Sequence, residues 1–436
     1  MLSPSHLMGF LCQRMLCRPC SGKPARLSQS EKGEKRGMGH GGEDQWGFGG
    51  KGTTSSALAA GLELVAAGVR STASASPAGG PKSSIEAASP PPEPTVGSLP
   101  AEILEKVVSF LPLRDAVRTS AVSRAWRRLW ESAPGLGLDW EYDTDPAVVD
   151  AVLMRYSRPV YSFRFHLSAA SFSHADGWVP LLAGKSVQAL HLHFEQFRDI
   201  EPHDMDVSIF SCRELTCLNL KGCDIPAPPP GLAGFPHLTR LYLWAVGFPE
   251  TGVRGLEALI AESPLIEVLW LTNLWFPEDE EDEDYEHEEW GIQVQNLQSL
   301  TIRSEDGKDY GWLIRELPSI EDVKISFSSY SINRDFVELL TALAPEVEVG
   351  VDILSAHWTD GLLGNLKSVS MYLATCQPNE MHFIEFVLSK ARQLQEFRIC
   401  VNEYCLKSNE ELIVEILKYR RASPQAKVFF SRMEFI

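Results

Sequence analysis

The sequence predicts an α/β protein in three parts: a disordered leader, a short unit of three helices, and a curved solenoid of stacked strand-and-return repeats. Three observations support this prediction. Residues 1–94 are rich in Gly, Ser, Ala and Pro, which disfavour regular structure. Residues 95–140 carry apolar positions at helical spacing. From residue 160 onward, one apolar pattern recurs about every 22 to 31 residues, a period typical of such repeats.

The charge of the chain is strongly acidic but unevenly distributed. The 436 residues include 40 Lys and Arg against 58 Asp and Glu, a formal net charge of −18. Between Glu278 and Glu289 only Tyr285 and His287 are not acidic, so this run supplies −10 of that charge. We expect a solvated loop there, with attraction of a basic partner as the alternative. Such a balance argues against nucleic acid as a partner.

Cysteine usage and hydropathy indicate a protein of a reducing compartment. The nine cysteines are an odd number spread thinly along the chain, unlike a secreted disulfide framework. No apolar stretch approaches the roughly 18 residues that a membrane helix needs. The sequence therefore predicts a soluble protein of the cytosol, the nucleus or both, without a membrane segment.

The leader, residues 1–94, ends in a proline-rich stretch at Ser89–Pro94. A segment with so many breakers and so little periodicity cannot offset its own ordering entropy, and we expect it to be disordered. Its first thirty residues hold basic side chains and no acid, so organellar targeting is the minor alternative. Whether the mature protein keeps or loses this leader stays open.

Residues 95–140 predict three short helices. The first ends before Pro112 and the third before Pro134, because proline disfavours helical geometry in the residue that precedes it. The apolar positions of these helices include Ile103, Leu104, Val107, Val108, Ala116, Val117, Trp126, Leu129 and Trp130. A unit of about forty residues cannot bury this many apolar side chains internally. Either a partner protein or the rest of the chain must cover the surplus.

The same segment resembles an F-box of the plant type. The resemblance is carried by Leu99-Pro100, Ile103-Leu104, Phe110-Leu111-Pro112, Ala116-Val117-Arg118-Thr119, Val122-Ser123 and Trp126-Arg127-x-Leu129-Trp130. It implies docking onto the Skp-family adaptor of a cullin-RING ubiquitin ligase, and through it contact with the cullin and RING subunits. The interface residues it implies are Leu99, Pro100, Ile103, Leu104, Val107, Phe110, Leu111, Pro112, Val117, Val122, Trp126, Leu129 and Trp130.

The recurring pattern matches the leucine-rich-repeat template, in which a strand with apolar anchors precedes a return segment. Leu215-x-x-Leu218-x-Leu220-x-x-Cys223 fits the template at every anchor. Further copies are Val160/Phe163/Phe165, Val187/Leu190/Leu192, Leu238/Leu241/Leu243, Ile266/Leu269/Leu271, Leu297/Leu300/Ile302, Ile320/Val323/Ile325, Leu366/Val369/Met371 and Leu394/Phe397/Ile399, with a degenerate one at Ala344/Val347/Val349. One repeat cannot cover its apolar face but stacked neighbours can, so we expect a horseshoe-shaped solenoid.

The end of the chain, through Tyr419-Arg420-Arg421 to Val428-Phe429-Phe430, resembles the FBD segment of plant F-box/leucine-rich-repeat proteins. We expect it to cap an otherwise open core. The predicted domains are the leader 1–94, the F-box 95–140, the repeat solenoid 141–365, and the last repeats with an FBD-like cap 366–436. Predicted return helices span 252–262, 335–343 and 380–394.

Strand residues between the apolar anchors should project from the opposite, concave face of the repeats. There, Tyr242, Trp244 and Trp270 form an aromatic cluster with basic residues around it. Exposed aromatics are costly unless something covers them, which points either to a target protein or to packing against neighbouring rungs. The substrate-binding candidates are Arg164, His191, Lys221, Arg240, Tyr242, Trp244, Trp270, Arg303 and Lys324. A target segment with acidic and apolar groups would suit them.

Chemistry-bearing patterns are weak. Neither a nucleophile–base set nor a cofactor fingerprint is found, so no catalytic residue and no cofactor is predicted. His191-x-His193-x-Glu195 could place metal ligands on one strand, but solvent-facing histidines are the preferred interpretation. Cys217 and Cys223 are expected to be structural. No metal site is predicted.

The resemblance therefore implies a non-catalytic substrate receptor of an SCF-type ubiquitin ligase, which binds the adaptor through the F-box and an unknown protein through the repeats. The alternatives are a ligase-independent binding scaffold and a small-molecule co-receptor that uses the same repeat face.

Overall fold

The computed structural model describes residues 99–140, 144–195, 201–231, 234–277, 290–304, 312–314, 317–326, 363–402 and 405–432. These fall into two compact units: a helical unit of residues 99–136 with 156–158, and a repeat unit of residues 137–155 with 159–432. The predicted leader, the acidic run 278–289, the predicted helix 335–343 and the degenerate repeat at 344–349 lie outside the described residues.

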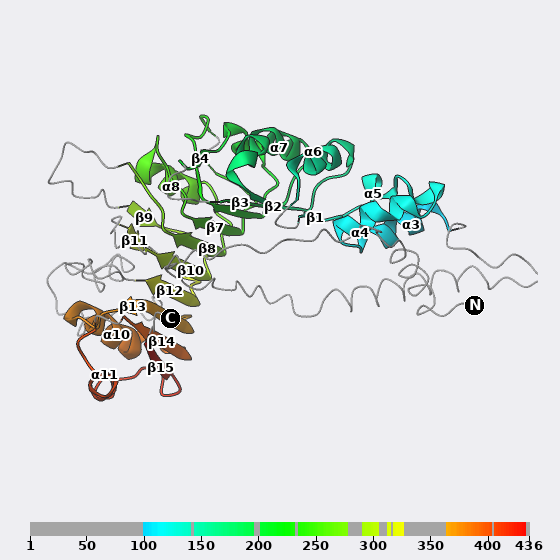
Figure 1. The fold of residues 1–436 in the computed structure, drawn as a ribbon. Helices are drawn as coiled ribbons and strands as arrows, with labels where there is room; N and C mark the ends of the chain where they lie inside the picture. Colours follow the sequence, from blue (N-terminus) through cyan, green and yellow to red (C-terminus); the bar gives the residue numbers. More distant parts are fainter. Residues whose placement is uncertain are drawn as a thin grey trace, which may run out of the picture. The chain divides into compact units, whose positions relative to one another are not determined.

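The helical unit contains α3 (Ala101–Ser109), α4 (Leu113–Arg118) and α5 (Leu129–Ser132), drawn in cyan in Figure 1. Two single 3-10 turns, Thr119–Ala121 and Arg124–Trp126, connect α4 to α5. The side chain of Ser132 on α5 donates a hydrogen bond to Glu105 of α3 (2.8 Å). Tyr156 donates from its hydroxyl to the carbonyl of Ala133 (2.9 Å), which ties residues 156–158 to this unit.

The third predicted helix is not continuous, which corrects the sequence-based expectation. Trp126 belongs to a 3-10 turn, whereas Leu129 and Trp130 begin α5 after two intervening residues. Arg128, between the two, has φ −126° and ψ 6°, outside helical geometry. The break lets Trp126, Leu129 and Trp130 all reach the interior of the unit, where each is at most 8 % exposed.

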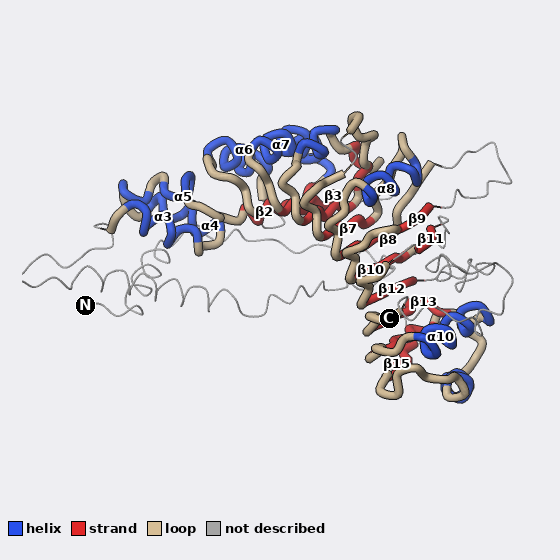
Figure 2. The backbone as a smooth tube through the Cα atoms, turned by 180° about the vertical axis from the view of Figure 1, so that it is seen from behind, coloured by secondary structure: helices blue, strands red, loops and turns tan. Residues whose placement is uncertain are grey.

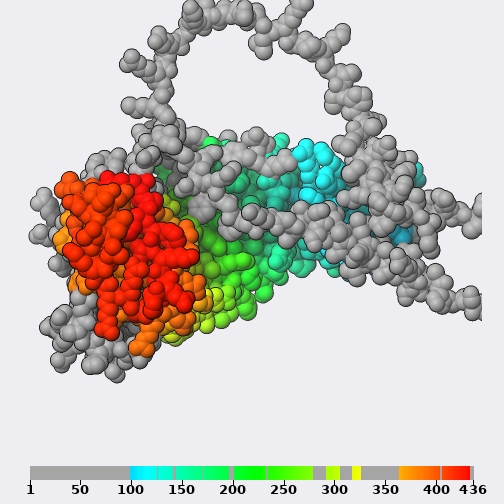
Figure 3. Space-filling model, turned by 90° about the horizontal axis from the view of Figure 1, so that it is seen from below, coloured from blue at the N-terminus to red at the C-terminus, as the bar shows by residue number. Residues whose placement is uncertain are grey.

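The repeat unit is organised by one parallel sheet of eleven strands, which follow one another across the sheet in chain order apart from the short strands of two side sheets (Figure 1). The strands are β1 (Leu138–Asp139), β2 (Ser162–Leu167), β3 (Ala189–Phe194), β5 (Cys217–Lys221), β7 (Arg240–Trp244), β8 (Val268–Thr272), β10 (Ser299–Arg303), β12 (Asp322–Ser326), β13 (Ser368–Ala374), β14 (Glu396–Val401) and β15 (Lys427–Arg432). Figure 3 shows the colours passing from green to red along this unit.

Return segments cover one face of the sheet (Figure 2). They include α6 (Pro146–Arg155), α7 (Phe172–Gly184), α8 (Gly252–Ala261), α10 (Pro378–Lys390), α11 (Asn409–Ile416) and the 3-10 helix Val207–Ser211. Trp178 of α7 packs edge-on against Phe163 and Phe165 of β2, with ring centroids 5.8 and 4.9 Å apart. The core therefore lies between the helices and the anchor side chains of the strands.

The described repeats confirm the predicted anchors. Every described anchor, from Val160 to Ile399, is at most 8 % exposed, and Cys217 and Cys223 are buried as well. The predicted return helices 252–262 and 380–394 appear as α8 and α10, with ends shifted by at most four residues. β12 pairs directly with β13, from Asp322 with Ser368 to Ser326 with Tyr372.

Two short side sheets run beside the main one, β4 (His203–Asp204) with β6 (Cys223–Asp224), and β9 (Trp290–Ile292) with β11 (Trp312–Ile314). Backbone bridges link Asp224 to Gly247 and Gly247 to Trp275. These contacts join the segments that follow successive strands of the main sheet to one another.

Candidate binding surfaces

The predicted adaptor-binding residues divide by exposure. Leu104, Trp126, Leu129 and Trp130 are buried inside the helical unit. Pro100, Phe110 and Pro112 are exposed, with Phe110 at 39 %, and Leu99, Ile103, Val107, Leu111, Val117 and Val122 are partly exposed. The first group shapes the unit, and the other two are available to a partner.

Helix α3 carries two apolar stripes, which explains this division. Leu104 and Val108, four residues apart, point into the unit. Ile103 and Val107, also four residues apart, stay partly exposed beside the exposed Phe110. A helix with a second apolar stripe leaves apolar surface for a partner to cover.

The second surface, which we call the open face, is the face of the main sheet opposite its helices. The strand register aligns its side chains in lateral rows. One row runs Arg164, His191, Asn219, Tyr242, Trp270, Thr301, Lys324, Ser370, Arg398 and Phe429. The next begins His166, His193, Lys221, Trp244 and Thr272, followed by Arg303. The rows contain every predicted substrate-binding residue except Arg240, which begins β7 two residues before Tyr242, because parallel pairing in register keeps equivalent residues level.

An aromatic cluster occupies the middle of the open face. Tyr242 and Trp270 lie on adjacent strands with ring centroids 6.4 Å apart, and the Trp270 indole donates to the Thr272 hydroxyl (2.7 Å). Lys221 places its ammonium 4.0 Å from the centre of the Trp244 ring. All three aromatic residues are only partly buried. Neighbouring rungs thus contact these rings without covering them completely.

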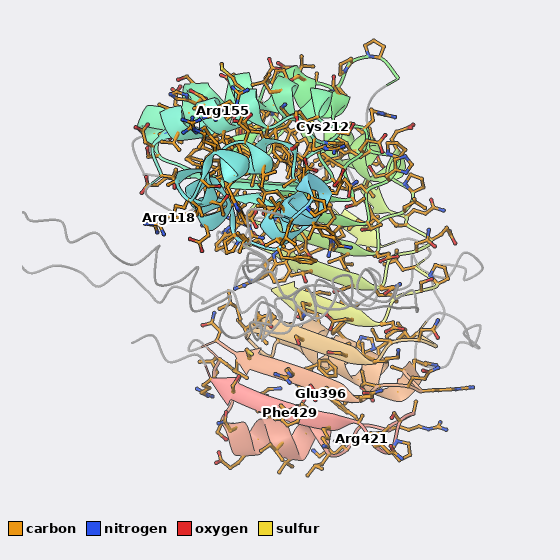
Figure 4. The ribbon with its side chains drawn as sticks, turned by 90° about the vertical axis from the view of Figure 1, so that its right-hand side faces the viewer. Arg118, Arg155, Cys212, Glu396, Arg421 and Phe429 are labelled. Atoms are coloured by element: carbon orange, nitrogen blue, oxygen red, sulfur yellow. The ribbon has the colours of Figure 1, made fainter. Side chains whose placement is uncertain are left out.

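The cations of the open face differ in what they contact. Lys324 pairs with Asp322 (2.8 Å) and Arg398 with Glu396 (2.8 Å), each through a carboxylate two residues away on its own strand. Arg303 lies 5.3 Å from the centre of the Tyr372 ring. Figure 4 labels Glu396 and Phe429 on the two strands at the C-terminal end of the sheet. By contrast, no carboxylate of the described residues forms an ion pair with Arg164 or Arg240.

Three histidines lie among these cations. His166 and His193 stack edge to face, with ring centroids 4.7 Å apart, and Nε2 of His193 lies 3.2 Å from the side-chain oxygen of Asn219. Burial, followed by the charge of Arg164, lowers the pKa of His191 to about 3. Burial and then His166 lower the pKa of His193 to about 4. Both imidazoles are therefore neutral at pH 7, and each can still donate one N–H.

Metal and nucleophile chemistry receives no support from the described residues. Within them, no group of three His, Cys, Asp or Glu side chains could hold a metal ion. Burial raises the pKa of the Cys217 thiol, and it raises that of Cys212 to about 12, so neither is a thiolate at pH 7. Across the described ranges, no helix is both long and apolar enough to span a bilayer.

Comparison with known proteins assigns both units. The family model of the F-box domain matches residues 97–135, which include α3 to α5. A second family model, described as "FBD-associated F-box protein At5g56370, LRR repeats", matches residues 175–346, which include β3 to β12. The chain therefore contains an F-box domain and a segment similar to the leucine-rich repeats of FBD-associated F-box proteins.

Similar proteins of Arabidopsis thaliana carry the same domains. F-box/FBD/LRR-repeat protein At1g13570 is 24 % identical over 77 % of this chain and 98 % of its own length. FBD-associated F-box protein At5g56370 is 27 % identical over 71 % of this chain and 70 % of its own. F-box/LRR-repeat protein At3g26922 is 26 % identical over 67 % of this chain and 92 % of its own. The similarity therefore extends well beyond the F-box into the repeats.

Sequence reasoning missed one residue of the open face. Tyr372 follows the anchor Met371 on β13 and contacts the guanidinium of Arg303. The alternation that identified Arg303 applies equally to the residue after Met371, and would have found it. That alternation could not show which cations are neutralised by a nearby carboxylate.

Proposed function

We propose that this protein is the non-catalytic substrate receptor of an SCF-type ubiquitin ligase. The F-box unit binds a Skp-family adaptor and, through it, the cullin and RING subunits. The leucine-rich repeats bind a target protein on their open face. The observation that supports the adaptor contact most directly is the second apolar stripe of α3, because the described residues leave Ile103 and Val107 partly exposed beside the exposed Phe110.

The adaptor-binding surface consists of the exposed and partly exposed members of the thirteen interface residues, with Ile103, Val107 and Phe110 at its centre. Their burial would supply the hydrophobic free energy that so small a unit lacks internally. Leu104, Trp126, Leu129 and Trp130 support this surface from beneath. The same division separates residues whose substitution weakens binding from residues whose substitution unfolds the unit.

The adaptor contact can be tested by co-purification of the full chain with a Skp-family adaptor. Val107→Asp places a charge in the apolar contact, so we expect at least a tenfold loss of captured adaptor with unchanged helical content by circular dichroism. Lys106→Asp is the matched control, one position along α3 and exposed to solvent. It should retain capture, whereas equal capture by both variants and the native chain would contradict the proposal.

On the repeat side, we propose that the rungs curve into a horseshoe whose inner surface is the open face. Parallel strands in chain order, with helices on one face only, support this shape, because helices occupy more width than strands and bend the stack towards the strand side. The partly exposed aromatic cluster then lies inside the curve, where a target can cover it. Affinity capture under proteasome inhibition, comparing the full chain with one lacking residues 95–140, would identify targets that accumulate only through the ligase.

A further inference from the structure

The basic side chains of the open face are not equivalent, although they resemble one another in the sequence. In the C-terminal rungs, Lys324 and Arg398 are each held 2.8 Å from a carboxylate of the same strand. In the N-terminal rungs, Arg164 on β2 and Arg240 on β7 are exposed and form no ion pair with a described carboxylate. Uncompensated positive charge therefore concentrates over strands β2 to β7.

These two arginines bracket a set of neutral hydrogen-bonding groups. The register places His191 on β3 and Asn219 on β5 between Arg164 and Tyr242 in one row. Arg240 begins β7 and stands in register with Cys217 of β5. Three strand spacings of about 4.8 Å separate β2 from β7, so two long arginine side chains can reach one ligand between them.

The charges of both arginines act on His191, which lies between them. The groups that face the histidines from the packed strands are Arg164 and His166 on β2, Lys221 on β5 and Arg240 on β7. Among the described acids, Asp139 on β1 stands in register with Arg164, and Glu195 follows β3. Asp139 accepts a hydrogen bond from Ser162 (3.0 Å). The centre of the cluster is thus a positive site with N–H donors.

We propose that the open face between β2 and β7 binds a doubly charged oxyanion of a target protein, with Arg164 and Arg240 as its two clamps. The oxyanion is a phosphate monoester or a pair of neighbouring carboxylates. The inference rests on target binding by the repeats and adds the chemical class of the target. His191 donates a hydrogen bond from below, His193 uses its one N–H to hold Asn219 in place, and an apolar residue next to the oxyanion packs on Tyr242 and Trp244.

Charge complementarity is the reason for choosing an acidic segment as the occupant. The chain as a whole carries a net charge of −18 and repels anions at long range, so an acidic ligand needs a local positive site. Planar guanidinium groups match carboxylate and phosphate geometry through paired N–H donors. Neutral His191 adds a hydrogen-bond donor without adding charge, and the neighbouring aromatic rings favour a peptide over a free inorganic ion.

The test uses the full chain and a fluorescein-labelled nonapeptide of alanine, leucine and serine in three forms. One form carries a central phosphoserine, the second two central glutamates, and the third unmodified serine. Fluorescence anisotropy should show at least tenfold tighter binding of one or both anionic forms over the serine form, weakened by added salt. Which anionic form binds tells the two sources apart, and binding of neither above the serine form overturns the proposal.

A matched pair of double variants locates the site. Arg164→Gln with Arg240→Gln removes both clamps, and we expect at least a tenfold loss of affinity for the anionic peptide. Lys367→Gln with Lys407→Gln removes the same charge at positions outside the open-face rows, where each lysine is paired with a carboxylate at 2.7 Å, Glu321 and Glu415 respectively, and should leave the affinity within twofold. Equal losses in both variants would indicate general attraction and overturn the proposal, as would no loss in the first. Adaptor capture is measured on the same preparations. A failure of adaptor binding can therefore be distinguished from a failure of oxyanion binding.

Discussion

At the scale of single residues, Gly247 shows how tightly successive repeats are joined. It bridges Asp224 on one side and Trp275 on the other through backbone contacts. A Cβ atom there would overlap the indole of Trp275 and the carboxylate of Asp224. Asp224 is itself buried, and burial followed by the charge of Asp204 raises its pKa to about 6. Glycine at this position is therefore required by close approach and not by backbone conformation.

We expect Gly247→Ala to destabilise the repeat unit by about 1–3 kcal/mol, because an overpacked side chain forces its neighbours to shift. Urea denaturation followed by circular dichroism would measure the loss. Gly177→Ala is a control of opposite sign, since Gly177 lies inside α7 with open space around its Cβ position. It should stabilise by up to about 1 kcal/mol through helix propensity. A Gly247→Ala protein as stable as the native chain would contradict the packing argument.

At the scale of elements, β3 combines a core strand with an unusual polar face. Leu190, Leu192 and Phe194 are at most 1 % exposed on the helix side. The alternate residues His191 and His193 face Arg164, His166, Lys221 and Arg240. Two-residue periodicity places both sets on one strand without conflict. The cost is that neither imidazole can be protonated in the folded state near neutral pH.

The lowered pKa values of His191 and His193 predict that the folded protein becomes less stable in acid. In the unfolded chain both histidines titrate near pH 6.5, whereas in the fold their pKa values are about 3 and about 4. Between these limits the unfolded state binds more protons, so the free energy of unfolding falls as the pH decreases from about 6.5 towards 4. Each histidine contributes a slope of at most about 1.4 kcal/mol per pH unit. Asp224 contributes with the opposite sign, because its pKa is raised.

The histidine contribution is isolated by comparing the native chain with His191→Gln plus His193→Gln. Urea denaturation at pH 7.5 and pH 5.0 should show a smaller loss of stability in the double variant, since its glutamines take up no proton. Asp224 is present in both proteins and cancels in the comparison. An identical pH dependence of the two proteins would show that the histidines are not held neutral by the fold.

At the scale of the whole molecule, the main sheet is a chain of nearest-neighbour contacts. Each strand pairs only with the one before and the one after it, from β1 to β15. Return helices extend the same order, with α6 near the first rungs and α11 near the last. In such an array, stability is close to a sum of local terms and interfaces. A defect at one end should therefore remain near that end.

Hydrogen exchange measured by mass spectrometry can test this locality with two equivalent core truncations. Leu412 in α11 and Leu153 in α6 are both 0 % exposed, and replacing either with Ala costs about 2–5 kcal/mol locally. We expect Leu412→Ala to increase exchange in β14 and β15 and to leave β2 unchanged, with the reverse for Leu153→Ala. Equal acceleration throughout the sheet in either variant would indicate a single cooperative unit instead.

Much of the architecture could be predicted because the spacing of the apolar anchor residues shows which face of each strand is buried. Leu218 and Leu220 identify both a strand and its buried face, since a one-residue shift would expose them. The segments that could not be predicted lack such a signal. The break between Trp126 and Leu129 depends on how the indole rings fit inside the helical unit, and the two-residue β1 is too short for alternation to reveal. For the two proposed binding surfaces, the sequence identified the residues. It did not show how exposed their side chains are or which side chains they contact.

The amino-acid sequence by itself determined the type and order of the parts: an F-box unit, a series of leucine-rich rungs, and the side chains that alternate with their anchors. It did so because periodicity of apolar residues fixes which face of an element is buried. Tertiary structure alone decided that Ile103 and Val107 remain partly exposed while Leu104 is buried inside the unit. It also decided that Lys324 and Arg398 are neutralised while Arg164 and Arg240 are not, because ion pairing depends on side-chain distances that spacing along the chain does not specify.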